Sequence, residues 1–274
     1  MMGGVVVAVL VVPLTARVWI VPALILVAIS LLDDWRGLPA SLRFSAHLIV
    51  SFWMCSELIP HEDWATRSIV AFAMVWITNL FNFMDGADGL AGGMTLWGFG
   101  SLGVAAWFAG DAVLAWSNFV VASVSLPFLL FNFHPARIFM GDAGSIPIGF
   151  LASTFGLIGW HGGVWSICFP VLVFSPFIVD ATVTLVRRIV RGQRFWEAHK
   201  GHYYQRLVLL GWSHRRLAIA EYVLMAGVGA SAVCAQIWRP SSFNVVVAVW
   251  IVIYLALLWA VDRRWADTAS VRRQ

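Results

Sequence analysis

Charged side chains are scarce in this sequence. Asp, Glu, Lys and Arg make up only 12% of its 274 residues, whereas 61% are hydrophobic and the mean hydropathy is +0.83. A soluble domain usually carries about 25% charged residues. The polar faces that would separate a large soluble core from water are missing, and apolar runs close to the length of a bilayer indicate membrane-spanning helices. We expect an all-α, polytopic membrane helical bundle.

Cysteine is also rare, and its distribution excludes a cysteine metal site. Cys55, Cys168 and Cys234 lie far apart inside apolar segments and form no C-x-x-C pair, so small hydrophobic filler is the favoured interpretation. Internal repeats are not visible, so an inverted-repeat transporter gains no support. Low-complexity linkers are missing as well, and we expect residues 1–274 to form a single integral-membrane domain.

Apolar segments alternate with polar loops along the whole chain. Lys and Arg divide between the two alternating sets of loops as 15 against 3, and the positive-inside rule places the richer set in the cytoplasm. The basic pI of about 9.3 therefore needs no nucleic acid partner. We expect about ten transmembrane helices, at 3–15, 18–32, 42–60, 65–82, 90–109, 112–132, 144–160, 163–188, 216–238 and 242–262.

Acids, amides and histidines gather at loops that this topology places on the cytoplasmic side. Carboxylates at membrane depth are costly unless they are paired or bound to metal, so we expect the active site at the cytoplasmic face. The members are Asp33 and Asp34 at the end of the second span, Asn79, Asn82, Asp85 and Asp88 at the end of the fourth, Asp142 after the sixth, and His199, His202 and Arg206 in the basic cytoplasmic loop 189–215.

The stretch NLFNFMDGADGLAGG, residues 79–93, favours a divalent metal. Steps of three residues rotate about 300° on a helix, so Asn82, Asp85 and Asp88 form a curved polar edge. Carboxylate and amide oxygens suit Mg²⁺ or Mn²⁺, and the interspersed glycines allow the close approach of a ligand. A capped helix end remains the alternative for any one of these residues taken singly.

The remaining acids leave alternatives open. Asp33 and Asp34 form either a polar stop at the membrane boundary or a repelling pair in which one acid has a raised pKa and exchanges protons. The GDAGS turn can press the Asp142 carboxylate and several backbone N–H groups against phosphate. Asp180 either pairs within the bundle or joins the site.

The basic loop favours an anionic ligand. His199 and His202 lie beside Lys200 and Arg206, a combination that suits a diphosphate. Zinc is a weaker option, because no further His or Cys lies nearby in the sequence. A divalent metal, phosphates and a membrane face together fit a reaction between a soluble phosphorylated donor and a lipid.

Four stretches carry a resemblance to a known family. NLFNFMDGADGLAGG, FMGDAGS, DDWRGL and HKGHYYQRL resemble the polyprenyl-phosphate N-acetylhexosamine-1-phosphate transferases, glycosyltransferase family 4. This family includes undecaprenyl-phosphate GlcNAc-1-phosphate transferase and phospho-N-acetylmuramoyl-pentapeptide transferase. The chain is most similar to the bacterial branch that initiates O-antigen and related polysaccharides.

The resemblance implies a reaction and its partners. The enzyme would transfer N-acetylhexosamine-1-phosphate from UDP-N-acetylhexosamine to undecaprenyl phosphate and release UMP. It would depend on Mg²⁺, with Mn²⁺ as a substitute, and would lie in the lipid bilayer of the bacterial inner (cytoplasmic) membrane with its active site facing the cytoplasm. Nucleic acid is not expected as a partner, and a homodimer is left open.

The resemblance also implies roles for single residues. Catalytic roles fall to Asp33 and Asp34, which match the acids thought to activate or position the lipid phosphate. The metal falls to Asn82, Asp142 and Asp88. Substrate binding falls to Arg43, Asn79, Asp85, His199, His202 and Arg206.

Two departures from the family pattern matter. The chain opens at MMGGVVVAVL, where relatives have an extra first span, so we expect a short form or a misassigned start. The loop lacks a His triplet and the acid pair lacks a following Lys, which disfavours a muramoyl-pentapeptide donor. A membrane transporter of a lipid-linked or ionic substrate, without transferase activity, is the alternative and predicts acids deep in the spans.

Overall fold

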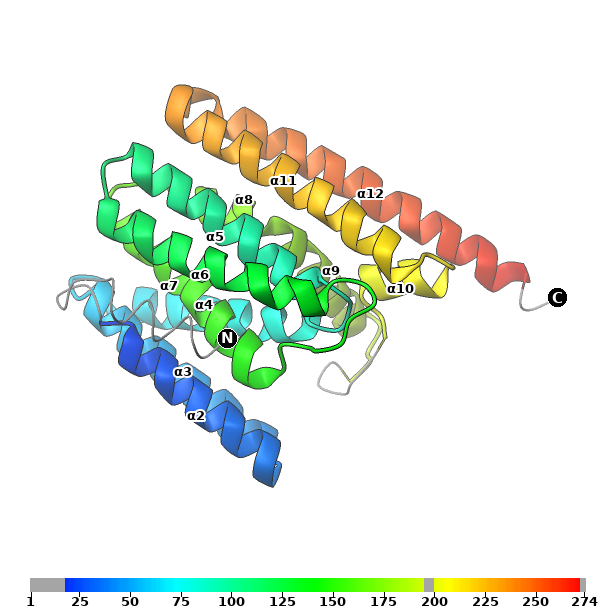
Figure 1. Ribbon diagram of the computed structural model, residues 1–274, viewed down its shortest axis with the longest axis horizontal. Helices are drawn as coiled ribbons and strands as arrows, with labels where there is room; N and C mark the ends of the chain where they lie inside the picture. The colour runs from blue at the N-terminus through cyan, green and yellow to red at the C-terminus, as the bar shows by residue number, and fades with distance from the viewer. Residues whose placement is uncertain (1–17, 195–199, 272–274) are drawn as a thin grey trace.

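The computed structural model describes residues 18–194 and 200–271 (Figure 1). These residues form helices and no strand, which confirms the all-α expectation. The predicted span 3–15 and His199 lie outside the described residues. In chain order the helices are α2 (Ile20–Arg36), α3 (Ala40–Leu58), α4 (Trp64–Met84), α5 (Leu90–Phe108), α6 (Ala112–Asn132), α7 (Asp142–His161), α8 (Cys168–Val173), α9 (Ser175–Val190), α10 (Tyr203–Leu209), α11 (His214–Trp238), the 3-10 helix η2 (Pro240–Ser242) and α12 (Phe243–Val271).

Five segments of the described chain are long and apolar enough to cross a membrane. They are α4, α6, α7, α11 and the stretch 240–268 that contains most of α12. The helices α2, α3 and α5 occupy further predicted span positions. A multi-pass membrane protein is therefore supported, while the number ten stays a prediction.

The structure differs from the predicted spans in the region between 163 and 215. The apolar segment expected at 163–188 is divided into α8 and α9, which meet at Phe174. Pro176 lies at the start of α9, where its missing N–H costs no helical hydrogen bond. The basic loop 189–215 contains the short helix α10, which apolar periodicity did not reveal because it has only 7 residues.

Several helices begin at a polar capping residue that the sequence supplies. The Asp63 side chain accepts a hydrogen bond from the Thr66 N–H at the start of α4, and Asp111 accepts one from the Leu114 N–H at the start of α6. Such caps satisfy backbone donors that have no partner within the helix. They account for two acids that the predicted topology places on the side opposite to the site.

Helix α7 is the central element of the bundle, since 78% of its most apolar 18-residue stretch is buried. It packs closely against α4, because a Cβ atom at Gly149 would lie only 2.7 Å from the Thr78 Cα. Small residues permit this kind of close approach between membrane helices. Because the two helices are antiparallel, Asn82, four residues after Thr78, lies beside Ser145, four residues before Gly149. The Asn82 amide nitrogen lies 3.2 Å from the Ser145 Oγ.

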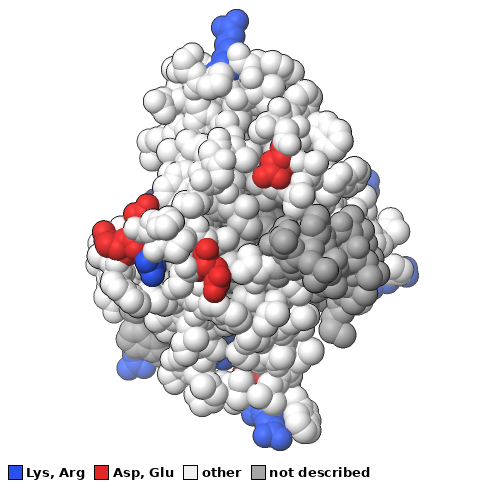
Figure 2. Space-filling model, turned by 90° about the vertical axis from the view of Figure 1, so that its left-hand side faces the viewer, with Lys and Arg blue, Asp and Glu red and all other residues white. Residues whose placement is uncertain are grey.

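Two helix pairs flank this centre. In Figure 1, α2 and α3 lie side by side at one edge of the molecule, and α11 and α12 form a long pair at the other edge. Only 6% of the most apolar 18-residue stretch within 240–268 is buried, which suits contact of α12 with lipid. The surface shown in Figure 2 is largely uncharged, with a few separate acidic and basic spots.

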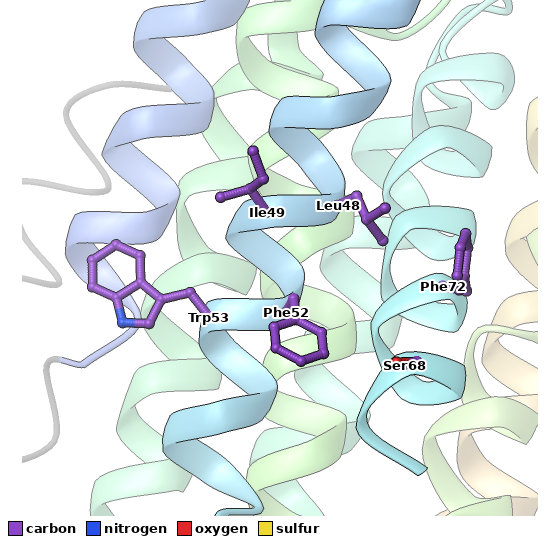
Figure 3. Close-up of a pocket in the computed structure, with 6 residues that line it drawn as sticks. All are labelled: Leu48, Ile49, Phe52, Trp53, Ser68 and Phe72. Carbon is purple, nitrogen blue, oxygen red and sulfur yellow. The ribbon is translucent and has the colours of Figure 1, made fainter. Parts of the chain in front are cut away.

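One groove on the surface is lined almost entirely by apolar side chains. A groove of about 440 Å³ lies between α3 and α4, and Figure 3 shows the side chains along it. Its residues are Leu48, Ile49, Phe52, Trp53, Ser68 and Phe72. Ser68 bonds to the carbonyl of Trp64 within its own helix, so convergent polar groups of the kind that mark a reaction site do not line this groove.

Candidate functional site

Asn82 and Asp142 form the centre of the candidate site. The Asn82 Nδ2 donates to Asp142 Oδ1 over 2.6 Å, although the two residues are 60 positions apart. Asn82 lies in the last turn of α4, and Asp142 is the first residue of α7. The close packing of α4 on α7 therefore joins two stretches that the sequence assigned to one metal site.

Arg43 connects this pair to Asp33 in the last turn of α2. Its Nη1 lies 2.7 Å from Asp33 Oδ2 and 3.5 Å from Asp142 Oδ2. Asp33 also accepts a hydrogen bond of 2.6 Å from the Leu38 N–H, because Gly37 adopts a left-handed conformation with φ 65° and turns the chain back. One cation thus lies between two carboxylates, and all three side chains keep some exposure to solvent.

Asp85 contributes a second carboxylate beside the start of α7. Its Oδ2 accepts a hydrogen bond of 2.9 Å from the Gly141 N–H, and Gly141 adopts φ 64°, a conformation that favours glycine. Burial raises the pKa of Asp85 to about 7; the N–H groups of Gly141 and Met140 lower it, and the charge of Asp142 adds to the increase. Asp85 Oδ1 is buried and has no hydrogen-bond partner among the described residues.

These residues fit a magnesium ion that is completed by substrate. Asp142 supplies carboxylate oxygen, Asn82 donates through its nitrogen and keeps an amide oxygen, and Asp85 has an unpaired buried oxygen. Within the described residues, no group of three or more His, Cys, Asp and Glu side chains could hold a metal by itself. Mg²⁺ commonly binds through one or two carboxylates together with substrate phosphates, so a sparse set of oxygens is what it requires.

Asp88, the third residue assigned to the metal, bonds to a different set of partners. Its Oδ2 lies 2.7 Å from His134 Nδ1 and accepts a hydrogen bond of 3.2 Å from the Ala136 N–H. His214 Nδ1 lies 3.6 Å from the other carboxylate oxygen. The two imidazole rings are stacked, with centroids 6.1 Å apart. Metal binding by Asp88 stays a prediction.

Two other predicted residues have little contact with this centre. Asp34 lies at the end of α2 with an exposed side chain, next to the partly buried Asp33. The Asn79 amide donates to the Val75 carbonyl of its own helix over 2.7 Å. Catalysis by Asp33 and Asp34 and substrate binding by Asn79 stay predictions.

His202 and Asp180 hold the start of α10. Asp180 Oδ1 lies 3.2 Å from His202 Nδ1, and the two carboxylate oxygens accept the N–H groups of Tyr203 and Tyr204 at 2.9 Å each. Asp180 thus caps α10 from within the bundle. His202 is 5% exposed, and its ring centroid lies 6.2 Å from that of Phe83, the residue after Asn82.

Arg206 is engaged by an acid near the C-terminal end of α12. Its Nη1 lies 3.1 Å from Asp262 Oδ1, and Arg187 Nη1 approaches the same oxygen at 2.7 Å. The Arg206 guanidinium also lies over the Tyr203 ring, 4.8 Å from its centroid. The predicted contacts of His202 and Arg206 with a diphosphate are not tested by this geometry.

Reasoning from the sequence missed several supporting residues. Asn132 is fully buried, accepts a hydrogen bond from the Gly89 N–H and donates one to the Ile138 carbonyl. His134, His214 and Asp262 lie outside the four motifs, and only the fold identifies their partners. The asparagine of FNFHP, at the end of an apolar run, was the one signal available for Asn132.

A model of the family described as glycosyl transferase family 4 matches residues 16–159. The probable undecaprenyl-phosphate N-acetylglucosaminyl 1-phosphate transferase of Bacillus subtilis is 32% identical over 236 residues, which cover 80% of this chain and 66% of that protein. The decaprenyl-phosphate N-acetylglucosaminephosphotransferase of Mycobacterium tuberculosis is 30% identical over 258 residues, which cover 81% and 64%. The phospho-N-acetylmuramoyl-pentapeptide-transferase of Oceanobacillus iheyensis is 30% identical over 174 residues, which cover 62% and 51%. The chain thus spans two thirds or less of the length of these relatives.

Proposed function

We propose, from the premise that the chain belongs to glycosyl transferase family 4, that it transfers N-acetylhexosamine-1-phosphate from a UDP-sugar to undecaprenyl phosphate. The reaction would release UMP and begin a lipid-linked polysaccharide such as O-antigen. Relatives in the comparisons are named for transfer to undecaprenyl or decaprenyl phosphate, which supports a polyprenyl phosphate as the acceptor.

One observation carries this proposal. Asp33, Arg43, Asp142 and Asn82 form a continuous series of contacts with distances of 2.7, 3.5 and 2.6 Å. These side chains come from four separate helices or helix ends. A cation and carboxylates in one place suit two phosphorylated molecules that must approach each other despite like charge.

Each residue of this series has a chemical role in the proposal. Asn82 and Asp142 would hold Mg²⁺, which when bound would neutralise charge on the donor diphosphate. Arg43 binds a phosphate, and its positive charge offsets the repulsion between the carboxylates of Asp33 and Asp142. Asp33, with the adjacent Asp34, positions the lipid phosphate whose oxygen attacks the sugar-linked phosphorus.

The same proposal places the protein in the inner membrane with this site facing the cytoplasm. The 15 to 3 division of Lys and Arg between loops supports that orientation. A UDP-sugar is soluble and an undecaprenyl phosphate head group lies at the membrane surface, so a site at the cytoplasmic ends of α2, α4 and α7 lets both molecules reach it. Family membership favours this enzyme over a transporter without transferase activity.

A direct assay tests the proposal. Purified protein in undecaprenyl phosphate-containing liposomes is given a panel of UDP-N-acetylhexosamines, and UMP is measured with Mg²⁺ and with EDTA. We expect UMP from at least one donor and only with Mg²⁺ and the lipid present. Asp111→Asn is the matched control, because Asn also caps a helix and should leave the rate unchanged. Wild-type protein that binds neither donor nor lipid phosphate would refute the proposal.

A further inference from the structure

Two tyrosines from the C-terminal third of the chain contact the stretch that carries Asp85 and Asp88. The Tyr204 Oη donates to the Phe83 carbonyl over 3.2 Å, and the Tyr222 Oη donates to the Gly89 carbonyl over 2.8 Å. Phe83 lies in the last turn of α4, and Gly89 is the last residue of the connection between α4 and α5. The tyrosines come from α10 and α11, outside the residues 16–159 that match the family model.

Gly86 and Gly89 in this connection, and Gly93 in the first turn of α5, leave the space that the tyrosines fill. A Cβ atom at Gly86 would overlap the Tyr204 hydroxyl, and one at Gly93 would lie 2.8 Å from Tyr222 Cζ and overlap its ring. A Cβ atom at Gly89 would lie 2.7 Å from the Tyr222 Oη. The close approach that these glycines allow is therefore made by side chains of the protein itself.

The tyrosines are themselves held in place. The Tyr204 N–H donates to Asp180 Oδ2 of α9 over 2.9 Å, and Gln205 Nε2 donates to the Tyr204 hydroxyl over 3.1 Å. Tyr204 is only 2% exposed. The Tyr222 ring packs against Phe133, with centroids 6.0 Å apart. Side chains fixed in this way can determine where a neighbouring backbone lies.

We infer that Tyr204 and Tyr222 are positioning residues for the reaction. They fix the connection between α4 and α5, and through it the carboxylates of Asp85 and Asp88. Asp85 in turn accepts the Gly141 N–H immediately before Asp142, so a shift of the connection would reach the centre of the site. The inference rests on the proposed function for its kinetic consequence but not for its structural one.

The kinetic test places a methyl group in the way of each tyrosine. Gly86→Ala and Gly93→Ala should lower kcat/KM for UDP-GlcNAc with undecaprenyl phosphate by about 10- to 100-fold per folded molecule, because small misplacements of catalytic groups have effects of this size. Gly100→Ala is the matched control on α5, since no described atom lies within 4 Å of its added Cβ. It should leave the rate and KM unchanged.

A rescue experiment separates positioning from loss of folding. Tyr222→Ala removes the ring that the added methyl of Gly93→Ala would overlap, so the double variant should lose less than the two single variants predict together. Tyr204→Phe and Tyr222→Phe keep the rings and remove only the hydroxyl bonds, and should raise KM by a few-fold with only a small fall in the melting temperature. Effects of the glycine variants that are strictly additive with Tyr222→Ala would overturn the inference.

A second measurement does not depend on activity. Hydrogen exchange of peptides covering 83–93 and 137–146 should become about tenfold faster in Gly86→Ala and Gly93→Ala, since the Gly141 N–H loses its bond to Asp85. Gly100→Ala should exchange like wild type. Unchanged exchange in both glycine variants would refute positioning even if the enzyme is active. Faster exchange in an enzyme that releases no UMP would support positioning while the proposed function fails.

Discussion

The side-chain amide of Asn82 donates to the carboxylate of Asp142 over 2.6 Å, at the point where the end of α4 meets the start of α7. Neither residue alone distinguishes a reaction site from a helix cap. Together with Arg43, which lies 3.5 Å from the same carboxylate, they combine oxygens of the kind that suit Mg²⁺ with a cation of the kind that suits phosphate.

Asp142→Asn tests the charge at this centre. The change keeps the shape of the side chain and removes one negative charge, so Mg²⁺ binding and transfer should fall by about 10²- to 10³-fold. UMP release and melting temperature would be measured on the same preparation. A variant with wild-type activity would contradict the assignment, and a variant that fails to fold would be replaced by Asp142→Glu, which should also lose activity because its carboxylate is displaced.

Arg43→Ala tests the cation between Asp33 and Asp142. The two carboxylates would then face each other without compensation, and the phosphate contact would be lost, so kcat/KM should fall by about 10²-fold. Arg43→Lys keeps the charge but not the planar guanidinium and should recover part of the activity. Arg36→Ala, an exposed arginine on α2, serves as the control; equal losses in Arg36→Ala and Arg43→Ala would count against a specific role.

Asp262→Asn tests the link between α12 and the basic loop. Asp262 bonds to both Arg187 and Arg206, and hydrogen bonds to charged groups contribute about 1.5–3 kcal/mol each when they are buried. Because Asp262 is 30% exposed, we expect a smaller loss, about 1–2 kcal/mol in the free energy of unfolding. Denaturant unfolding monitored by tryptophan fluorescence would measure it, and an unchanged midpoint would exclude a stabilising role.

The pH dependence of stability tests the environment of Asp85. Burial raises its pKa to about 7, so the folded protein binds a proton that the unfolded chain releases at lower pH. The stabilising effect of this proton is complete below the unfolded pKa near 4 and is lost as pH rises through about 7, at about 1.4 kcal/mol per unit of pKa difference. Melting temperatures of metal-free protein at several pH values would show the decline.

Asp85→Asn should flatten that decline, because the amide does not titrate. Glu57→Gln, a change in a carboxyl that lies far from the site in the sequence and on the α3 end opposite to Arg43, should leave it intact. Parallel pH profiles for wild type and Asp85→Asn would show that another group is responsible.

The sequence contained enough information for the centre of the site but not for its supports. Asn82 and Asp142 lie in distinctive motifs at the ends of apolar runs, so it could be predicted that they lie on the same side of the membrane, and their contact agrees with this. Their contact depends on Gly149, which lets α7 approach α4. A single glycine in an apolar run does not indicate which helix packs against it. The presence of helices could be predicted, because hydropathy depends on residues that are neighbours in the sequence. Contacts between helices could not be predicted, because packing depends on residues that are far apart in the chain.

The partners of Asp88 and Arg206 illustrate this limit. His134 and His214 meet Asp88 from positions 46 and 126 residues onward in the chain. In the sequence, Asp262 resembles an ordinary polar residue near the end of a membrane helix. Only the packing of α12 beside α10 shows which residues it contacts. The break between α8 and α9 was signalled by Pro170 and Pro176, but long apolar runs also tolerate proline in membrane helices.

The most direct test of the account is mass spectrometry of the lipid product. Protein in liposomes with undecaprenyl phosphate, UDP-GlcNAc and Mg²⁺ should form undecaprenyl diphosphate-linked GlcNAc in equal amount to the UMP released. Neither product should form with EDTA or with Asp142→Asn. Lipid-linked sugar that forms equally well in EDTA, or in the Asp142→Asn protein, would contradict a site in which Asn82 and Asp142 hold a cation between two phosphates.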